Sequence, residues 1–133
     1  MRDLLLRFPN VVGWVNGHTH TNSVTPHARP TGTAVGGGFW EINTASHVDW
    51  PQQARIVEVV SNGDGTLSIF GTILDHVGQA AAPAPGTSAS AMDFNDLTSA
   101  ARTMSFNDLQ SGAPLGEGTP QDRNVELLIP DPR

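Results

Sequence analysis

Two histidines separated by one residue follow directly on an apolar segment near the start of the chain. His18 and His20 lie in the tetrapeptide Gly17-His18-Thr19-His20, and the preceding residues, 11–16, are Val-Val-Gly-Trp-Val-Asn. A short apolar run bounded by turn residues predicts a buried strand. The loop that leaves such a strand can aim two imidazoles at neighbouring points, so the pattern indicates part of a metal site. The alternative is a pair of histidines that only form hydrogen bonds within a loop.

The donor atoms available to such a site are restricted by the composition. The chain has 133 residues and no cysteine. Thiolate ligands are therefore excluded, and any metal ion has to be bound by nitrogen and oxygen donors. Imidazole binds a metal in its neutral form, so acid is expected to weaken binding through competition by protons.

Charge and hydropathy restrict the partners. The chain carries 13 acidic and 7 basic residues, a formal net charge of -6, which disfavours binding to nucleic acid. Leu4-Leu5-Leu6 is interrupted by Arg7 and Pro9, so we expect no signal peptide. No apolar segment is long enough to span a membrane. The cellular compartment stays open.

The segments around the histidines predict the elements that position them. A helix over residues 2–8 is expected to precede the first strand. Residues 21–38 are rich in Thr, Pro and Gly and are expected to form a loop beside the site. Aromatic and β-branched residues predict a second strand over 39–44, and a turn is expected at 46–51.

The clearest structural signal is a β-hairpin. Strands predicted over 55–60 and 67–74 flank an Asn-Gly and an Asp-Gly pair at 62–65, and such pairs favour the positive backbone angles of tight turns. Both strands carry apolar residues on both faces, which is typical of a sheet covered on two sides. We therefore expect the hairpin to pack against more protein than the chain contains, or to leave an apolar face exposed.

The rest of the chain predicts one helix and one more strand. Residues 78–90 are expected to form a flexible connector of Ala, Pro, Gly and Ser. Ser90 and Asp93 resemble a helix cap, and apolar residues recur at helical spacing to about residue 104. Alternating apolar residues over 124–129 predict an edge strand. The length fits a single domain over 1–133, divided into 1–77, the connector 78–90, and 91–133.

These motifs resemble the carboxyl-terminal part of one bacterial branch of the calcineurin-like metallophosphoesterases. The first likeness is the apolar strand followed by Gly-His-Thr-His at 17–20. Four further segments agree in order: FWEINTAS at 39–46, DWPQQ at 49–53, NGDGT at 62–66 and DRNVEL at 122–127. The resemblance covers most of the chain.

The resemblance implies a fold, an activity and a ligand set. The fold is an α+β or α/β arrangement of mainly antiparallel strands plus one helix, forming the carboxyl-terminal portion of a four-layer αββα sandwich. The activity is hydrolysis of phosphomonoesters or phosphodiesters at two divalent or trivalent transition metal ions (Mn, Fe or Zn). His18 would bind one ion and His20 the other, and the phosphate ester would be the partner of the site.

Other signatures of that family are absent from the sequence. The motifs Asp-x-His, Gly-Asp-x-x-Asp and Gly-Asn-His followed by Asp or Glu do not occur. Two ligands do not complete two metal sites. The isolated chain is therefore expected to be inactive and to need a missing amino-terminal region or another chain. The alternative is a catalytically inactive β-rich interaction module, or truncated remnant, that pairs with another chain.

Other polar residues near the histidines have two interpretations each. Asn22 follows the tetrapeptide and His27 lies in the next loop, so both are candidates for binding substrate, although a turn role explains Asn22 equally well. His47 and Asp49 are expected to be structural residues of a turn. A mononuclear site completed by His27, His47 or an acidic residue is a further possibility.

Overall fold

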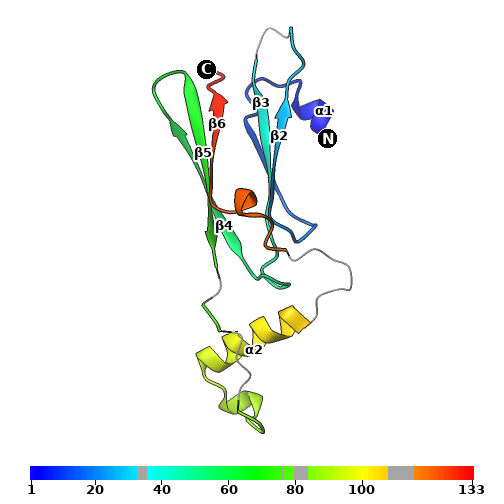
Figure 1. The fold of residues 1–133 in the computed structure, drawn as a ribbon, viewed down its shortest axis with the longest axis vertical. Coiled ribbons are helices and arrows are strands. Elements are labelled where there is room, and N and C mark those ends of the chain that lie inside the picture. The colour runs from blue at the N-terminus through cyan, green and yellow to red at the C-terminus, as the bar shows by residue number, and fades with distance from the viewer. Residues whose placement is uncertain (33–35, 76, 80–83, 108–115) are drawn as a thin grey trace.

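The fold is α+β, with two small sheets and one main helix. The computed structural model describes residues 1–32, 36–75, 77–79, 84–107 and 116–133. The elements, in chain order, are α1 (Arg2–Leu5), β1 (Gly13–Asn16), β2 (Ser23–Ala28), β3 (Gly38–Asn43), β4 (Ala54–Ser61), β5 (Thr66–Leu74), η1 (Ala89–Ala91), α2 (Phe94–Asn107), η2 (Pro120–Asp122) and β6 (Val125–Pro130). The two sheets lie side by side, and α2 lies beyond one end of them (Figure 1).

The first sheet contains the strand that leads into the histidines. Its order is β1-β3-β2, with β3 in the centre. β1 pairs with β3 in parallel, and the register places Asn16 opposite Asn43. β2 pairs with β3 in the antiparallel sense. Because β1 and β3 are parallel, the loops that follow them leave the sheet at the same edge.

The second sheet contains the predicted hairpin, which is confirmed. β4 and β5 are antiparallel, and Gly63 and Gly65 in the connecting turn have positive φ angles of 74° and 88°. β6 pairs with β5 and completes the order β4-β5-β6, so it is the predicted edge strand. Its alternation is also as predicted, because Leu127 and Ile129 are buried while Leu128 between them is exposed.

The core lies between the two sheets. Ile42 of the first sheet is fully buried against apolar side chains of the second, namely Leu67, Ile69, Leu127 and Ile129. The opposite face of the second sheet is not covered by the described part of the chain. There, Ile56 and Val60 of β4 are 45% and 44% exposed, and Leu128 of β6 is 61% exposed. By the strand register the same face also carries polar side chains, namely Glu58, Ser68, Thr72 and Glu126. The hairpin sequence predicts exposed apolar residues here, and they are present on a face of mixed character.

The prediction of a loop over residues 21–38 is wrong at Ser23–Ala28, which form β2. The Thr- and Pro-rich composition favours a loop, but an edge strand tolerates proline because one side of its backbone needs no partner. Pro26 lies in this edge strand opposite Trp40. The amino-terminal helix is also shorter than predicted and ends at Leu5.

The predicted helix is present but begins later than expected. α2 starts at Phe94 because the cap is Asp93: its carboxylate accepts the backbone N–H of Asp96 at 2.9 Å, and Asp96 Oδ2 accepts the N–H of Asp93 at 3.3 Å. Ser90 lies instead in η1. The apolar side chains of α2 are largely exposed, Phe94 and Met104 to 71% each.

The predicted connector falls partly outside the described residues, at 80–83, and its last two residues belong to η1.

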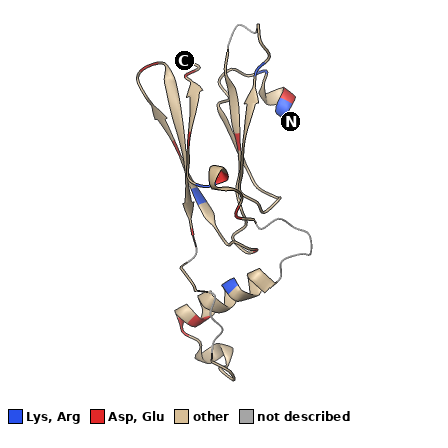
Figure 2. Cartoon of the chain, viewed as in Figure 1, with Lys and Arg blue, Asp and Glu red and all other residues tan. Residues whose placement is uncertain are grey.

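Acidic and basic residues are dispersed along the chain and do not gather on one element (Figure 2). In the described part of the chain, no helix combines the length and the apolar character needed to cross a bilayer.

Candidate functional site

The parallel pairing of β1 and β3 brings two loops together at one edge of the first sheet. The loop after β1 contains the two histidines, and the loop after β3 contains the predicted turn at 46–51. Thr44 connects the two loops, since its N–H donates to the carbonyl of Asn16 at 3.0 Å and its hydroxyl donates to the same oxygen at 3.2 Å. Residues 28 positions apart therefore lie next to each other.

Both histidines have unusual backbone angles. His18 has φ of 82° and His20 has φ of 56°, a left-handed conformation that non-glycine residues adopt uncommonly. Asn43, at the end of β3, holds the loop in this shape. Its side-chain amide donates to the hydroxyl of Thr19 at 2.6 Å and to the carbonyl oxygen of Thr21. Such backbone strain persists where the surrounding structure enforces it, often at functional sites.

Asp49 orients the ring of His20. Nδ1 of His20 lies 2.5 Å from Oδ2 of Asp49, and the two side chains are 53% and 49% exposed. An ion pair this exposed contributes little to stability, so its main effect is to fix the ring. Metal-ligating histidines are oriented by a similar partner, a carboxylate beside one ring nitrogen, while the other nitrogen binds the ion.

The remaining imidazole nitrogens of the pair are available. Among the described residues, no hydrogen bond involves Nε2 of His20 or either ring nitrogen of His18. This donor set, two imidazoles with a carboxylate beside one of them, fits a transition metal ion that prefers nitrogen ligands. Within the described ranges, however, no group of three or more His, Cys, Asp or Glu side chains is placed to hold an ion.

Asn22 is buried at the start of β2. The residue is 1% exposed, and its Nδ2 donates to Oε1 of Gln53 at 2.8 Å and to the carbonyl of Glu117 at 3.4 Å. Its Oδ1 accepts the backbone N–H of Ala45 at 3.0 Å and Nη2 of Arg55 at 3.2 Å. These contacts favour a structural role for Asn22 over contact with substrate.

His27 lies in β2 and not in the loop, four residues or about 13 Å further along the strand than Ser23. Its Nε2 lies 2.7 Å from Oε2 of Glu41, and its ring packs on Phe39 with 4.8 Å between centroids. Hydrogen bonds from His27 and from Asn16 lower the pKa of Glu41 below its ordinary value. His27 is thus engaged with β3, and this favours a structural role.

A cleft opens beside Asp49, between the loop after β3 and α2. Its volume is about 730 Å³, and its lining residues are mostly apolar or neutral: Val48, Asp49, Gln52, Ala101, Met104, Ser105 and Asn107. Trp50 joins the two walls, because Phe106 packs edge-on against it at 5.0 Å and the guanidinium of Arg102 lies over its ring at 5.0 Å. The cleft is large enough for a small organic group.

Sequence reasoning selected the two histidines as candidates, predicted Asp49 only as a structural residue of the turn, and did not select Asn43. Asn43 acts from the end of β3 and Asp49 from the loop that follows it, and their contacts with the histidine loop depend on the parallel register of β1 and β3. The one signal that pointed to them is that the end of β3 and the start of the loop after it are rich in polar residues.

Comparison of the chain with protein-family models, with curated proteins and with solved structures gives no match.

Proposed function

We propose that the chain contributes His18 and His20 to a dinuclear metal centre that hydrolyses phosphomonoesters or phosphodiesters. The other ligands come from protein outside this sequence, either an amino-terminal region or another chain. The observation that carries the proposal is the contact of 2.5 Å between Nδ1 of His20 and Asp49, which leaves Nε2 for an ion.

The arrangement of the site supports this chemistry. Metal ions held here would supply polarisation of the phosphate ester and activation of a water molecule for in-line attack. The residues of this chain supply two of the ligands and orient them. His18 and His20 provide nitrogen ligands, Asp49 fixes the ring of His20, and Asn43 fixes the loop that carries both rings. The cleft next to Asp49 is the place for the organic group of the ester, and its lining of mainly neutral side chains suits an uncharged group.

The two facing sheets support the finer fold proposal. In a four-layer αββα sandwich, two sheets form the centre and helices cover their outer faces. Exposed apolar residues on the outer face of β4–β5–β6 are consistent with such a cover supplied by other protein. We therefore propose that the 133 residues form the carboxyl-terminal portion of a metallophosphoesterase domain.

The test is metal-dependent activity of the completed protein. The chain is expressed with the region that supplies the remaining ligands, and hydrolysis of 4-nitrophenyl phosphate is measured with and without Mn²⁺. His18→Ala and His20→Ala are each expected to abolish hydrolysis. His47→Ala is the matched control, because His47 is an exposed histidine of the neighbouring loop. Unchanged rates for both His18→Ala and His20→Ala would reject the proposal.

A second function is favoured by one observation, the exposed apolar residues on the outer face of β4–β5–β6. A β-rich module without catalytic activity would use this face to bind another chain, and Ile56, Val60 and Leu128 would lie in the interface. Light scattering and elemental analysis of the purified chain separate the two functions. A defined oligomer without metal favours the module, whereas stoichiometric metal favours the phosphoesterase.

A further inference from the structure

Residues 116–123 form a strap across the start of β2, immediately after the histidine loop. The carbonyl of Gly116 accepts the backbone N–H of Asn22 at 2.8 Å, and Oδ1 of Asp122 accepts the backbone N–H of Val24 at 2.8 Å. The strap therefore binds Asn22 and the start of β2, while Asn43 binds the histidine loop. The proposed metal chemistry assigns no role to residues 116–123.

Gly116 lies where the two loops of the site approach each other. The residue is buried, and a Cβ atom at this position would collide with the carbonyl oxygen of His20. The same atom would lie 2.7 Å from the carbonyl oxygen of Trp50 and 2.9 Å from Cδ of Pro51. Real Cβ atoms do not come this close to backbone oxygens, so only glycine fits between the loops that carry His20 and Asp49.

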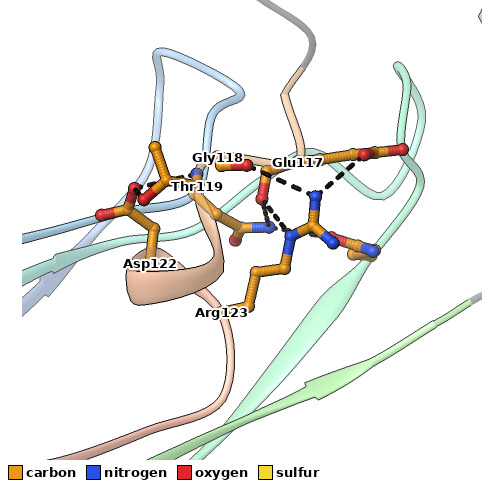
Figure 3. Close-up of polar contacts among 7 residues, drawn as sticks. Glu117, Gly118, Thr119, Asp122 and Arg123 are labelled. Atoms are coloured by element: carbon orange, nitrogen blue, oxygen red, sulfur yellow. Dashed lines mark hydrogen bonds and ion pairs between the residues drawn. The ribbon is translucent and has the colours of Figure 1, made fainter.

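The strap is held in shape by its own polar contacts (Figure 3). Oδ2 of Asp122 accepts the backbone N–H of Thr119 at 3.0 Å and its hydroxyl at 2.5 Å, and the bond from the backbone N–H is half of a capping box on η2. Arg123 donates to the carboxylate of Glu117 at 3.0 Å and to the carbonyl of Gly118 at 3.4 Å. Glu117 and Arg123 thus close the segment into a compact turn.

The strap is also fastened to the second sheet. Nη2 of Arg55, in β4, donates to the carbonyl oxygen of Asp122 and to Oδ1 of Asn22. Burial would raise the pKa of the Asp122 carboxyl, but the hydrogen bonds from Thr119 and Val24 and the charge of Arg55 together lower it below its ordinary value. The Asp122 carboxylate is therefore charged near neutral pH, as its role as a three-bond acceptor requires.

We infer that the strap at 116–123 positions His20, with Gly116 as the positioning residue that sets the spacing between the histidine loop and the loop of Asp49. The role of His20 as a metal ligand rests on the proposed function. The positioning of His20 by the strap does not depend on that function. A substitution at Gly116 that pushes the two loops apart separates Nδ1 of His20 from Asp49 and turns the ring away from its orientation.

The experiment compares Gly116→Ala with Gly36→Ala in the full chain without metal. Gly36 is a matched control because a Cβ there meets no atom within 4 Å. Imidazole ¹⁵N spectra report each ring separately. We expect Gly116→Ala to shift the ring signals of His20 while those of His27, which is bound to Glu41, remain at their wild-type positions. Gly36→Ala is expected to leave both unchanged.

A second readout separates positioning from folding. Under conditions in which both proteins are fully folded, Gly116→Ala is expected to weaken Zn²⁺ binding by about 10–100-fold, the usual cost of disturbing a residue that orients a ligand. Wild-type His20 ring signals in folded Gly116→Ala would overturn the inference. Absence of Zn²⁺ binding in the wild type together with shifted His20 signals would count against the proposed function and support the strap.

Asp122→Asn keeps the test decisive if Gly116→Ala does not fold. An amide can still accept the N–H of Val24, but its nitrogen replaces the oxygen that accepts both donors of Thr119. Hydrogen exchange at Thr119 reports that the strap has loosened. Faster exchange with shifted His20 signals supports the inference, and faster exchange with unshifted His20 signals overturns it. Unchanged exchange and unchanged signals would also overturn it, because Asp122 would then not hold the strap.

Discussion

Replacement of Asn22 by alanine should destabilise the protein more than any exposed substitution near the site. The side chain is 1% exposed and joins three segments: the loop after β3 through Ala45 and Gln53, β4 through Arg55, and the strap through Glu117. Alanine removes all of these bonds at once and leaves buried groups without partners.

The magnitude follows from the groups left behind. Four groups lose their bonds to the Asn22 side chain: the N–H of Ala45, Oε1 of Gln53, Nη2 of Arg55 and the carbonyl of Glu117. The carbonyl of Glu117 keeps its bond to Arg123, so three groups enter the sum. Each unsatisfied buried group costs about 1–3 kcal/mol. Nη2 of Arg55 keeps its bond to Asp122, and partial relaxation lowers the sum, so we expect a loss of about 3–4 kcal/mol. A domain with a total of about 5–15 kcal/mol would lose a large part of its stability.

Urea unfolding followed by tryptophan fluorescence measures this loss. Asn10→Ala is the matched control, because Asn10 is exposed in a turn and its replacement should change the free energy of unfolding by less than about 0.5 kcal/mol. A loss below about 1 kcal/mol for Asn22→Ala would refute the reasoning, because the bonds listed above would then have little energetic value.

Three further predictions concern a carboxylate, a turn and a ligand-orienting side chain. The hydrogen bond from His27 lowers the pKa of Glu41 from 4.5. The stabilisation that this bond provides is therefore present above pH 4.5 and is lost as the pH falls through the lower folded value. Glu41→Gln should be less stable than wild type at neutral pH, and urea titrations should show the difference shrinking below pH 4.5. A stability difference that does not change with pH would contradict this. Gly63→Ala should lose about 1 kcal/mol of unfolding free energy because its φ is +74°, whereas Gly36→Ala should lose less; equal losses would contradict the turn geometry. Asp49→Ala should change stability by less than about 0.5 kcal/mol yet weaken Zn²⁺ binding about 10–100-fold in isothermal titration, and unchanged affinity would contradict its role.

The parts of the fold that follow local rules could be predicted from the sequence. The Asn-Gly and Asp-Gly pairs identify the turn between β4 and β5, and the alternation in β6 identifies its buried face. The helix α2 was located by its spacing, although its first residue was displaced because Asp93 caps it and Ser90 does not. Signals of this kind depend on residues within a few positions of each other.

Features that depend on tertiary pairing could not be predicted. β2 contains Pro26 and forms only because it lies at the edge of a sheet beside β3. The contact between His20 and Asp49 joins residues 29 positions apart, and it exists because β1 and β3 are parallel and in register. The strap reaches Asn22 from almost 100 residues further along the chain, so no local pattern indicates it.

The most direct test of the central claim identifies which nitrogen atoms bind a metal. Zn²⁺ is titrated into the ¹⁵N-labelled chain, and long-range imidazole ¹H–¹⁵N spectra assign the ring nitrogens of each histidine. We predict that Zn²⁺ shifts Nε2 of His20 and one ring nitrogen of His18, while Nδ1 of His20 stays protonated beside Asp49 and the rings of His27 and His47 are unchanged. Zn²⁺ that shifts His27 or His47 and leaves His18 and His20 at their metal-free positions would contradict the account.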